Sequence, residues 1–245
     1  MESIKLWFED FAADFRQNFI DEDRWKMLLE GLGVTLTITF FAVLVGIVLG
    51  VIVAAVRSTW DKNRTAMRPG IGKVVLGFFN WLCKVYLTVF RGTPVVVQLI
   101  IMYYVIFASS NNGTLVAILA FGINSGAYVA EIVRSGIMSI DPGQMEAGRS
   151  LGFNYTQTML YIVLPQAFKN VLPALANEFI VLLKETSVAG YIAIEDLTKA
   201  GDMIRSRTFS AFLPLLAVAL IYLLLVVVLS WLVGKLERRL RSSEH

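Results

Sequence analysis

The stretch 31-GLGVTLTITFFAVLVGIVLGVIVAAV-56 carries no charged side chain. A run of about 20 apolar residues is long enough to cross the hydrocarbon core of a bilayer as a helix. The rest of the chain agrees with this reading, because 56% of its 245 residues are hydrophobic and only 17% are charged. That composition is too apolar for a soluble domain of this length. The sequence therefore predicts an all-α polytopic membrane protein.

Charge along the chain predicts about five transmembrane helices. We expect spans over residues 31–56, over a segment that ends near residue 108, over residues 114–135, over residues 171–194 and over residues 209–234. Lys and Arg gather after the first span at residues 57–73, after the third at residues 134–169 and after the last at residues 235–241. The positive-inside rule assigns such loops to the cytoplasm. The amino terminus is then expected outside the membrane and the carboxyl terminus in the cytoplasm.

The segment from Val74 to Phe90 is harder to place, because Asn80 and Lys84 interrupt its apolar pattern. The motif Arg91-Gly92-Thr93-Pro94 follows it, and Thr at an N-cap with Pro at the first helical position favours the start of a helix. We interpret Val74–Phe90 as a cytoplasmic-side segment leading into the second span. A separate span of its own is the alternative.

Residues 1–30 form an acidic segment ahead of the membrane domain, residues 31–245. They lack the basic start and apolar core of a signal peptide. Five apolar residues recur at helical spacing, Ile4, Phe8, Phe11, Phe15 and Phe19. The spacing favours an amphipathic helix on the outer membrane surface; a loose tail with chance periodicity is the other reading.

Several kinds of chemistry are disfavoured by residue counts. Cys83 is the only cysteine and His245, the last residue, is the only histidine. One cysteine cannot form an internal disulfide or a Cys-based metal cluster, and a chain terminus is a poor place for a catalytic base. We therefore expect no catalytic residue and no metal site.

Residues 139–167, SIDPGQMEAGRSLGFNYTQTMLYIVLPQA, are polar and rich in helix-end signals. Asp141 followed by Pro142 predicts a capped helix start, with Gln144 in position to complete a capping box. Gly152 suits a left-handed helix end. Asn154 with Gln157 predicts a second capped helix, which Pro165 should end or kink. The segment thus predicts two short cytoplasmic surface helices.

One face of the first short helix is nearly bare, because Ala147 and Gly148 have little or no side chain. Another protein could approach this face closely, between the charges of Glu146 and Arg149. We take Glu146, Ala147, Gly148, Arg149 and Gly152 as a docking site. A cytoplasmic loop that merely folds neatly is the alternative.

Motifs in this region and elsewhere carry a family resemblance. Glu146-Ala147, then Gly152 and Ile162-Val163-Leu164-Pro165, resemble the EAA loop of bacterial ABC importer permeases, with Gly148 in place of the usual second alanine. Four further stretches narrow the resemblance to the polar amino acid uptake group: 91-RGTP-94 with Gln98, 125-SGAYVAEI-132, 183-LKETS-187 and 236-LERRL-240. The resemblance covers the chain from about Gly31 onward.

The resemblance implies a type I permease architecture in the bacterial inner or plasma membrane, with residues 139–167 as the coupling-helix loop. It implies an ATP-driven importer for a polar or charged amino acid. Its partners would be two cytoplasmic ATPase subunits, a second permease copy or sister permease, and an extracytoplasmic amino-acid-binding protein. The chain has no Gly-x-x-x-x-Gly-Lys-Ser/Thr phosphate loop, so it is not expected to be an enzyme itself. ATP and Mg²⁺ would be bound by the ATPase.

A substrate pathway should appear as polar side chains at membrane depth, since a charge there is costly unless it faces a cavity or a partner. Asn124, Tyr128 and Glu131 share one helical face. The candidates are Gln98, Asn124, Tyr128, Glu131, Glu178, Lys184 and Glu185. Each also has a structural alternative: Tyr128 packing, Gln98 bonding a neighbouring helix, or Lys184 and Glu185 forming interhelical ion pairs.

Two other functions stay open at this point. A secondary transporter or channel would use the carboxylates in the spans to carry protons, and it predicts internal repeats, of which we see none. A membrane enzyme or an assembly scaffold is the second. Neither explains the two capped helices of residues 139–167.

Overall fold

The computed structural model describes residues 2–65 and 67–241, and His245 lies outside them. These residues are helical almost throughout. The helices are α1 (Glu2–Phe15), α2 (Trp25–Asn63), α3 (Ile71–Gly92), α4 (Val95–Ile101), α5 (Gly113–Met138), α6 (Pro142–Ser150), α7 (Tyr155–Thr158), α8 (Leu164–Glu185), α9 (Leu197–Thr208) and α10 (Phe212–Arg241). Short π- or 3₁₀-helical turns join several of them: η1 (Arg16–Ile20), η2 (Asp21–Asp23), η3 (Met102–Ile106), η4 (Met159–Val163) and η5 (Thr186–Ile192).

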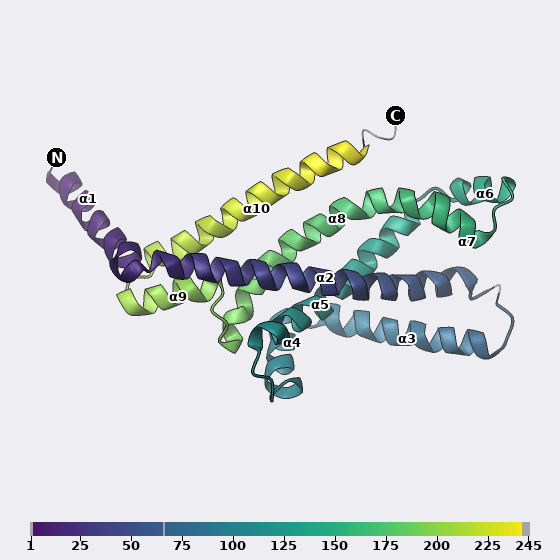
Figure 1. Cartoon of the computed structure of the whole chain (residues 1–245), viewed down its shortest axis with the longest axis horizontal. Helices are drawn as coiled ribbons and strands as arrows, with labels where there is room; N and C mark the ends of the chain where they lie inside the picture. Colours follow the sequence, from purple (N-terminus) through teal and green to yellow (C-terminus); the bar gives the residue numbers. More distant parts are fainter. Residues whose placement is uncertain (1, 66, 242–245) are drawn as a thin grey trace.

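Five helical stretches in the described part of the chain are long and apolar enough to cross a membrane, as expected. They are Trp25–Lys62, Ile71–Gly92, Gly113–Met138, Tyr155–Ile192 and Phe212–Leu240. The long helices α2, α5, α8 and α10 run between two ends of the molecule (Figure 1). The α2–α3 loop and α6–α7 lie at one end, whereas α1 and α9 lie at the other.

The second span differs from our interpretation. We placed it in the segment that ends near residue 108, with Val74–Phe90 leading into it. Instead, α3 is itself a 22-residue helix long enough to cross, and the apolar helix that follows, Val95–Ile106, is too short to cross alone. Asn80 and Lys84 do not interrupt α3, which is continuous through both residues, and Asn80 is buried. The break falls at Thr93, which is extended (φ −123°, ψ 147°).

The fourth span also begins earlier than expected. Pro165 does not end the helix that starts at Tyr155, although proline cannot donate a backbone hydrogen bond. The turn before it, η4, is π-helical, and the Leu164 N–H bonds the Met159 carbonyl five residues back. The chain therefore stays helical from α7 through η4 into α8.

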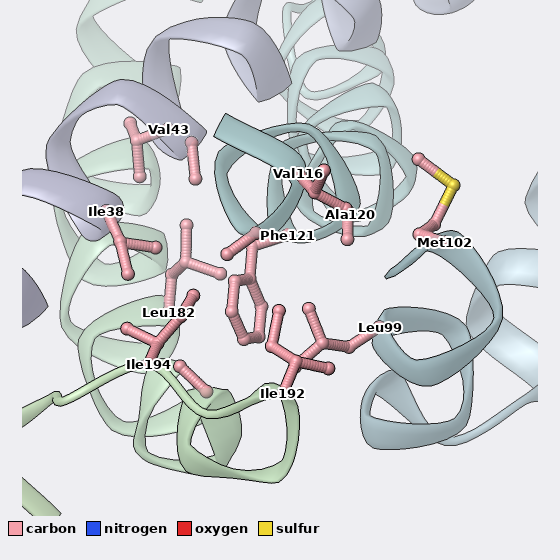
Figure 2. Packing of buried hydrophobic residues seen from close by; sticks show 13 residues of the cluster. Ile38, Val43, Leu99, Met102, Val116, Ala120, Phe121, Leu182, Ile192 and Ile194 are labelled. Carbon is pink, nitrogen blue, oxygen red and sulfur yellow. The ribbon is translucent and has the colours of Figure 1, made fainter. Parts of the chain in front are cut away.

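The largest core cluster lies where α2, α5, α8 and η5 meet. Phe121 of α5 is fully buried, and its ring points among Leu99, Leu182, Ile192 and Ile194 (Figure 2). Small residues let α2 approach α5 closely: a Cβ on Gly50 would lie 2.5 Å from Val129 Cγ1, and a Cβ on Gly122 would lie 2.7 Å from Val45. This packing holds α5 at the centre, where its polar face meets both α3 and α8.

Candidate functional site

The two short helices predicted within residues 139–167 are present as α6 and α7. Asp141 caps α6, since its Oδ1 accepts a hydrogen bond from the Gly143 N–H at 2.7 Å, and Pro142 is the first helical residue. Gln144 does not complete a capping box as we expected. Its Oε1 instead accepts from Gln166 Nε2 at 3.2 Å, so this side chain ties α6 to α8.

The junction between α6 and α7 follows the sequence prediction. Gly152 has a φ of 85°, in the left-handed region that a glycine adopts without strain, and the Phe153 N–H bonds back to the Gly148 carbonyl at 3.1 Å. Asn154 and Gln157 form a reciprocal capping box, with both hydrogen bonds at 2.9 Å. The sharp turn and the capped start fix α7 against α6.

Gly148 does not belong to the exposed face that we predicted. It is buried, and a Cβ added to it would lie 2.4 Å from Thr158 Cγ2, 2.8 Å from Thr158 Oγ1 and 3.0 Å from Ile162 Cδ1. The missing side chain therefore lets α6 pack on α7 and η4. Glu146, Ala147 and Arg149 are exposed on the other sides of α6, as is Gly152 beyond its end.

Other helices support the α6–α7 unit in ways that the sequence analysis missed. A cavity of about 650 Å³ separates α6 from the ends of α2 and α5, and its lining includes Asp61, Lys62, Arg134, Glu146 and Arg149. Lys62 Nζ lies over the Tyr155 ring, 5.5 Å from its centroid. Arg134 of α5 pairs with Asp61 of α2 at 3.9 Å. Charges at the ends of two spans thus converge beside α6.

Two pathway candidates, Gln98 and Asn124, lie together at the α3–α4 break. Asn124 Nδ2 donates to Gln98 Oε1 at 2.9 Å and to the Phe90 carbonyl at 3.0 Å. Gln98 Nε2 donates to Phe90 O at 2.9 Å and to Thr93 Oγ1 at 2.7 Å. Thr93 is thus a partner of Gln98 rather than the predicted N-cap, and Pro94 precedes α4. Both side-chain amides are buried, and they donate hydrogen bonds to backbone carbonyls that the end of α3 leaves unpaired.

The same face of α5 continues to Tyr128 and Glu131, where Arg91 joins them. The Arg91 guanidinium lies 5.7 Å from the Tyr128 ring centroid, and its Nη1 lies 3.6 Å from Glu131 Oε1. Glu131 also pairs with Arg134 at 3.4 Å. The shared face predicted for Asn124, Tyr128 and Glu131 therefore meets the end of α3. Arg91 was quoted in a motif but not predicted as a site residue, because its partners come from another helix.

The three charged candidates on α8 lie apart. Glu178 is 8% exposed and accepts a hydrogen bond from Ser125 Oγ of α5 at 2.7 Å, so it links two spans. Lys184 is exposed and lines a cavity of about 250 Å³ with Thr198 and Tyr222. Glu185 is half-buried and makes none of the ion pairs or hydrogen bonds found among the described residues. A direct Lys184–Glu185 pair is likewise not among those contacts.

A buried carboxylate at the opposite end of the molecule was not expected. Asp196 is 0% exposed and caps α9, with its Oδ1 accepting from the Lys199 N–H at 2.9 Å. Its Oδ2 is buried with no hydrogen-bond partner among the described residues. Burial raises the pKa of Asp196 from 3.8 to about 6, and its hydrogen bonds to backbone N–H groups oppose this only in part.

Metal ligands do not gather in the part of the chain that the structure describes. In residues 2–65 and 67–241, no three His, Cys, Asp or Glu side chains are placed to hold a metal ion. The geometry offers instead a two-helix surface unit and a line of polar contacts between spans.

Comparisons with known proteins agree with this arrangement. Residues 71–242 match the family described as "Binding-protein-dependent transport system inner membrane component". The chain is 36% identical over 220 residues to the arginine transport system permease protein ArtQ of Bacillus subtilis (strain 168), covering 89% of this chain and 94% of that protein. It is 34% identical over 221 residues to the glutamine transport system permease protein GlnP of Escherichia coli (strain K12), covering 88% and 93%.

Solved structures give the same result. The fold matches a chain of an amino acid ABC transporter crystallised with histidines, with a TM-score of 0.78, 38% identity, and coverage of 90% of this chain and 98% of that one. An inward-facing MetNI methionine ABC transporter matches with a TM-score of 0.71 at 21% identity, covering 88% and 97%, which shows the fold alone. The two curated relatives are both named as transport system permease proteins. The chain therefore belongs to the inner membrane components of binding-protein-dependent transport systems, the permeases of ABC importers, within their amino acid uptake group.

Proposed function

We propose that this chain forms the translocation pathway of an ATP-driven importer for a polar or charged amino acid, and that it couples to a separate ATPase through α6. Amino acid permeases are its relatives, and a permease of this family works with an ATP-binding partner and a substrate-binding protein. The relatives do not favour the secondary transporter or channel.

The observation that carries the coupling role is the α6–α7 unit. It has caps at both helix starts, close packing at Gly148, and Glu146, Ala147 and Arg149 exposed to water. A segment that transmits movement from the ATPase must be rigid, because a flexible segment would absorb that movement. The sequence carries no phosphate loop, which supports hydrolysis in a partner subunit that binds ATP and Mg²⁺.

The orientation is part of the proposal. Five basic residues fall in the last two turns of α2, in the α2–α3 loop and in the first turn of α3: Arg57, Lys62, Arg64, Arg68 and Lys73. The α2–α3 loop lies at the end of the molecule that also carries α6 and α7 (Figure 1). The positive-inside rule favours the cytoplasm for that end, so α1 and α9 would face outward. By the logic of the family, two copies of the ATPase would act on two permease subunits in the bacterial cell membrane.

The pathway residues have unequal support. Tyr128, with Arg91 and Glu131, is partly exposed at 36% and is available to a substrate. Gln98 and Asn124 have their hydrogen bonds filled by the end of α3, and Glu178 by Ser125. We propose a positioning role for these three, and we place the substrate-contacting residues among Tyr128, Glu131, Lys184 and Glu185.

Docking can be tested by co-purifying the ATPase with Glu146→Arg, which reverses a charge on the exposed face of α6. The matched control is Glu30→Arg, the same reversal at an exposed position near the other end of α2. We expect the first variant to lose the ATPase and the second to retain it. Equal retention by both, with both permeases folded, would contradict docking through α6.

A further inference from the structure

The first helix, α1, carries an apolar face that no span covers. Its exposed large side chains are Leu6, Trp7, Phe8, Phe11 and Phe15, each between 41% and 61% exposed. Trp7 stacks on Phe11 with ring centroids 5.6 Å apart, and it meets Phe8 edge-on at 5.1 Å. All of these except Leu6 fall on one side of the helix, so they form a single strip.

The opposite side of α1 is charged and exposed. On that side Lys5 and Glu9 form an exposed ion pair at 3.9 Å. Asp10 and Asp14 are also exposed, and because they follow Trp7 by three and seven residues they flank the strip along its Trp7 edge. Four acidic residues against one lysine give Glu2–Phe15 a net negative charge. Attraction to anionic headgroups therefore cannot hold this helix on a membrane, and only its apolar strip can.

The carboxyl-terminal end of α1 lies at the end of the molecule away from α6–α7 (Figure 1). Asn18 is fully buried, and Thr208 Oγ1 at the end of α9 donates to its Oδ1 at 2.8 Å. Phe15 meets Phe19 at 5.0 Å, and Phe19 lies in the core cluster with Leu28, Leu197 and Ile204. The strip thus runs without a break from the exposed helix into the protein core.

Other exposed apolar side chains lie near the carboxyl-terminal end of α1. Phe209 is 94% exposed and Phe212 is 71% exposed, directly after the Thr208 contact. Ile20, at the end of η1, and Trp25, the first residue of α2, are exposed as well. Aromatic side chains near the ends of membrane spans are typical of the boundary between lipid headgroups and acyl chains, and the adjoining helices α2 and α10 are long and apolar enough to cross a bilayer.

We propose that α1 lies in the outer interface of the bilayer, with Trp7, Phe8, Phe11 and Phe15 inserted among the lipids. It is an in-plane anchor that ties α9, through Asn18 and Thr208, to the membrane surface. A lipid surface fits better than a protein partner, because α1 leads through two short turns into α2, which is long and apolar enough to cross a membrane. The exposed side chains of Phe209 and Phe212 also follow Thr208, which bonds Asn18 just after α1. The side of the membrane rests on the proposed function; the insertion itself does not.

The test is electron paramagnetic resonance on the full-length chain in nanodiscs. In a Cys83→Ser background, which removes the only native thiol, nitroxides are attached at Phe8→Cys or Phe11→Cys. The matched controls, on the opposite side of the helix, are Glu9→Cys and Ala13→Cys, both at exposed positions. Accessibility to oxygen, which partitions into lipid, is compared with accessibility to a water-soluble nickel chelate.

We expect the two strip positions to favour oxygen, at a depth of about 5–10 Å below the headgroups, and the two control positions to favour nickel. The depth should be equal in zwitterionic and anionic nanodiscs. Nickel access at all four positions would place α1 in water and overturn the proposal. Exclusion of both reagents at Phe8 and Phe11 would place protein over the strip, and insertion only in anionic nanodiscs would show electrostatic binding; either result also overturns it.

Discussion

The packing of Gly148 gives the sharpest prediction, through Gly148→Ala. The new Cβ would lie 2.4 Å from Thr158 Cγ2 and 2.8 Å from its Oγ1, whereas carbon atoms pack best at about 3.5–4.0 Å. Thr158 is 0% exposed, and its hydroxyl is held by a hydrogen bond to the Asn154 carbonyl at 3.0 Å. It therefore cannot rotate away, and α6 must shift instead.

The size of the effect follows from two opposing contributions. Overpacking a tight site costs about 1–3 kcal/mol, and replacing Gly by Ala inside a helix gains about 0.5–1 kcal/mol. Because two atoms of Thr158 clash, the overpacking cost should lie near the upper end of its range, at about 3 kcal/mol. Subtracting a helix gain of about 1 kcal/mol leaves a net cost of about 2 kcal/mol. If the strain is relieved by displacing α6, the docking surface is displaced with it. Affinity for the ATPase should then drop by up to about 30-fold, the factor that corresponds to about 2 kcal/mol.

A double-mutant cycle with Thr158→Ala tests this reasoning. Thr158→Ala removes both clashing atoms, and Ile162 Cδ1, at 3.0 Å, is the flexible end of a side chain. We expect the double variant to bind the ATPase within about twofold of Thr158→Ala alone. Affinity would be measured by titrating ATPase onto the permease in nanodiscs. Wild-type affinity for Gly148→Ala, or a double variant as weak as Gly148→Ala, would refute the packing argument.

Three further predictions concern stability. Asn154→Ala should destabilise the start of α7 by about 1 kcal/mol, seen as faster amide hydrogen exchange at residues 155–158 with little change in α5; an unchanged rate would contradict the capping role. Asn124→Leu removes the donor to Gln98 Oε1 and leaves the Phe90 carbonyl with Gln98 Nε2 alone, at a cost of about 1–3 kcal/mol, so the thermal unfolding midpoint should fall; lost uptake with an unchanged midpoint would instead indicate substrate contact. Asp196 has a raised pKa of about 6, so its contribution to stability is full below its ordinary pKa of 3.8 and is lost as the pH rises through 6. Asp196→Asn should therefore melt above wild type at pH 7 and like wild type near pH 4, and a parallel pH dependence in the two proteins would contradict the assignment.

The membrane fold follows from features that lie close together in the sequence. An uncharged run such as 31–56 predicts a span from length alone, and Asp141, Gly152 and the Asn154–Gln157 pair predict helix ends within one turn. These signals were confirmed because their partners are a few residues away. The π-helical turn before Pro165 was missed, because it depends on backbone geometry that no single residue type indicates.

Contacts between helices could not be predicted in the same way. Gly148 is buried by Thr158, ten residues on across the turn at Gly152, and nothing in the local pattern shows which face of α6 meets α7. Asn124 and Gln98 were each identified as polar residues at membrane depth, but their pairing depends on where α3 breaks. The buried state of Asp196 depends on how tightly the surrounding helices close over it.

The most direct test of the central claim is uptake into vesicles that hold this permease, its ATPase and a binding protein, with a panel of labelled amino acids. The account predicts uptake of at least one amino acid that requires ATP, is indifferent to the proton gradient, and is lost in Glu146→Arg while Glu30→Arg retains it. Uptake that continues without ATP and follows a proton gradient, or that is equal in both variants, would contradict it.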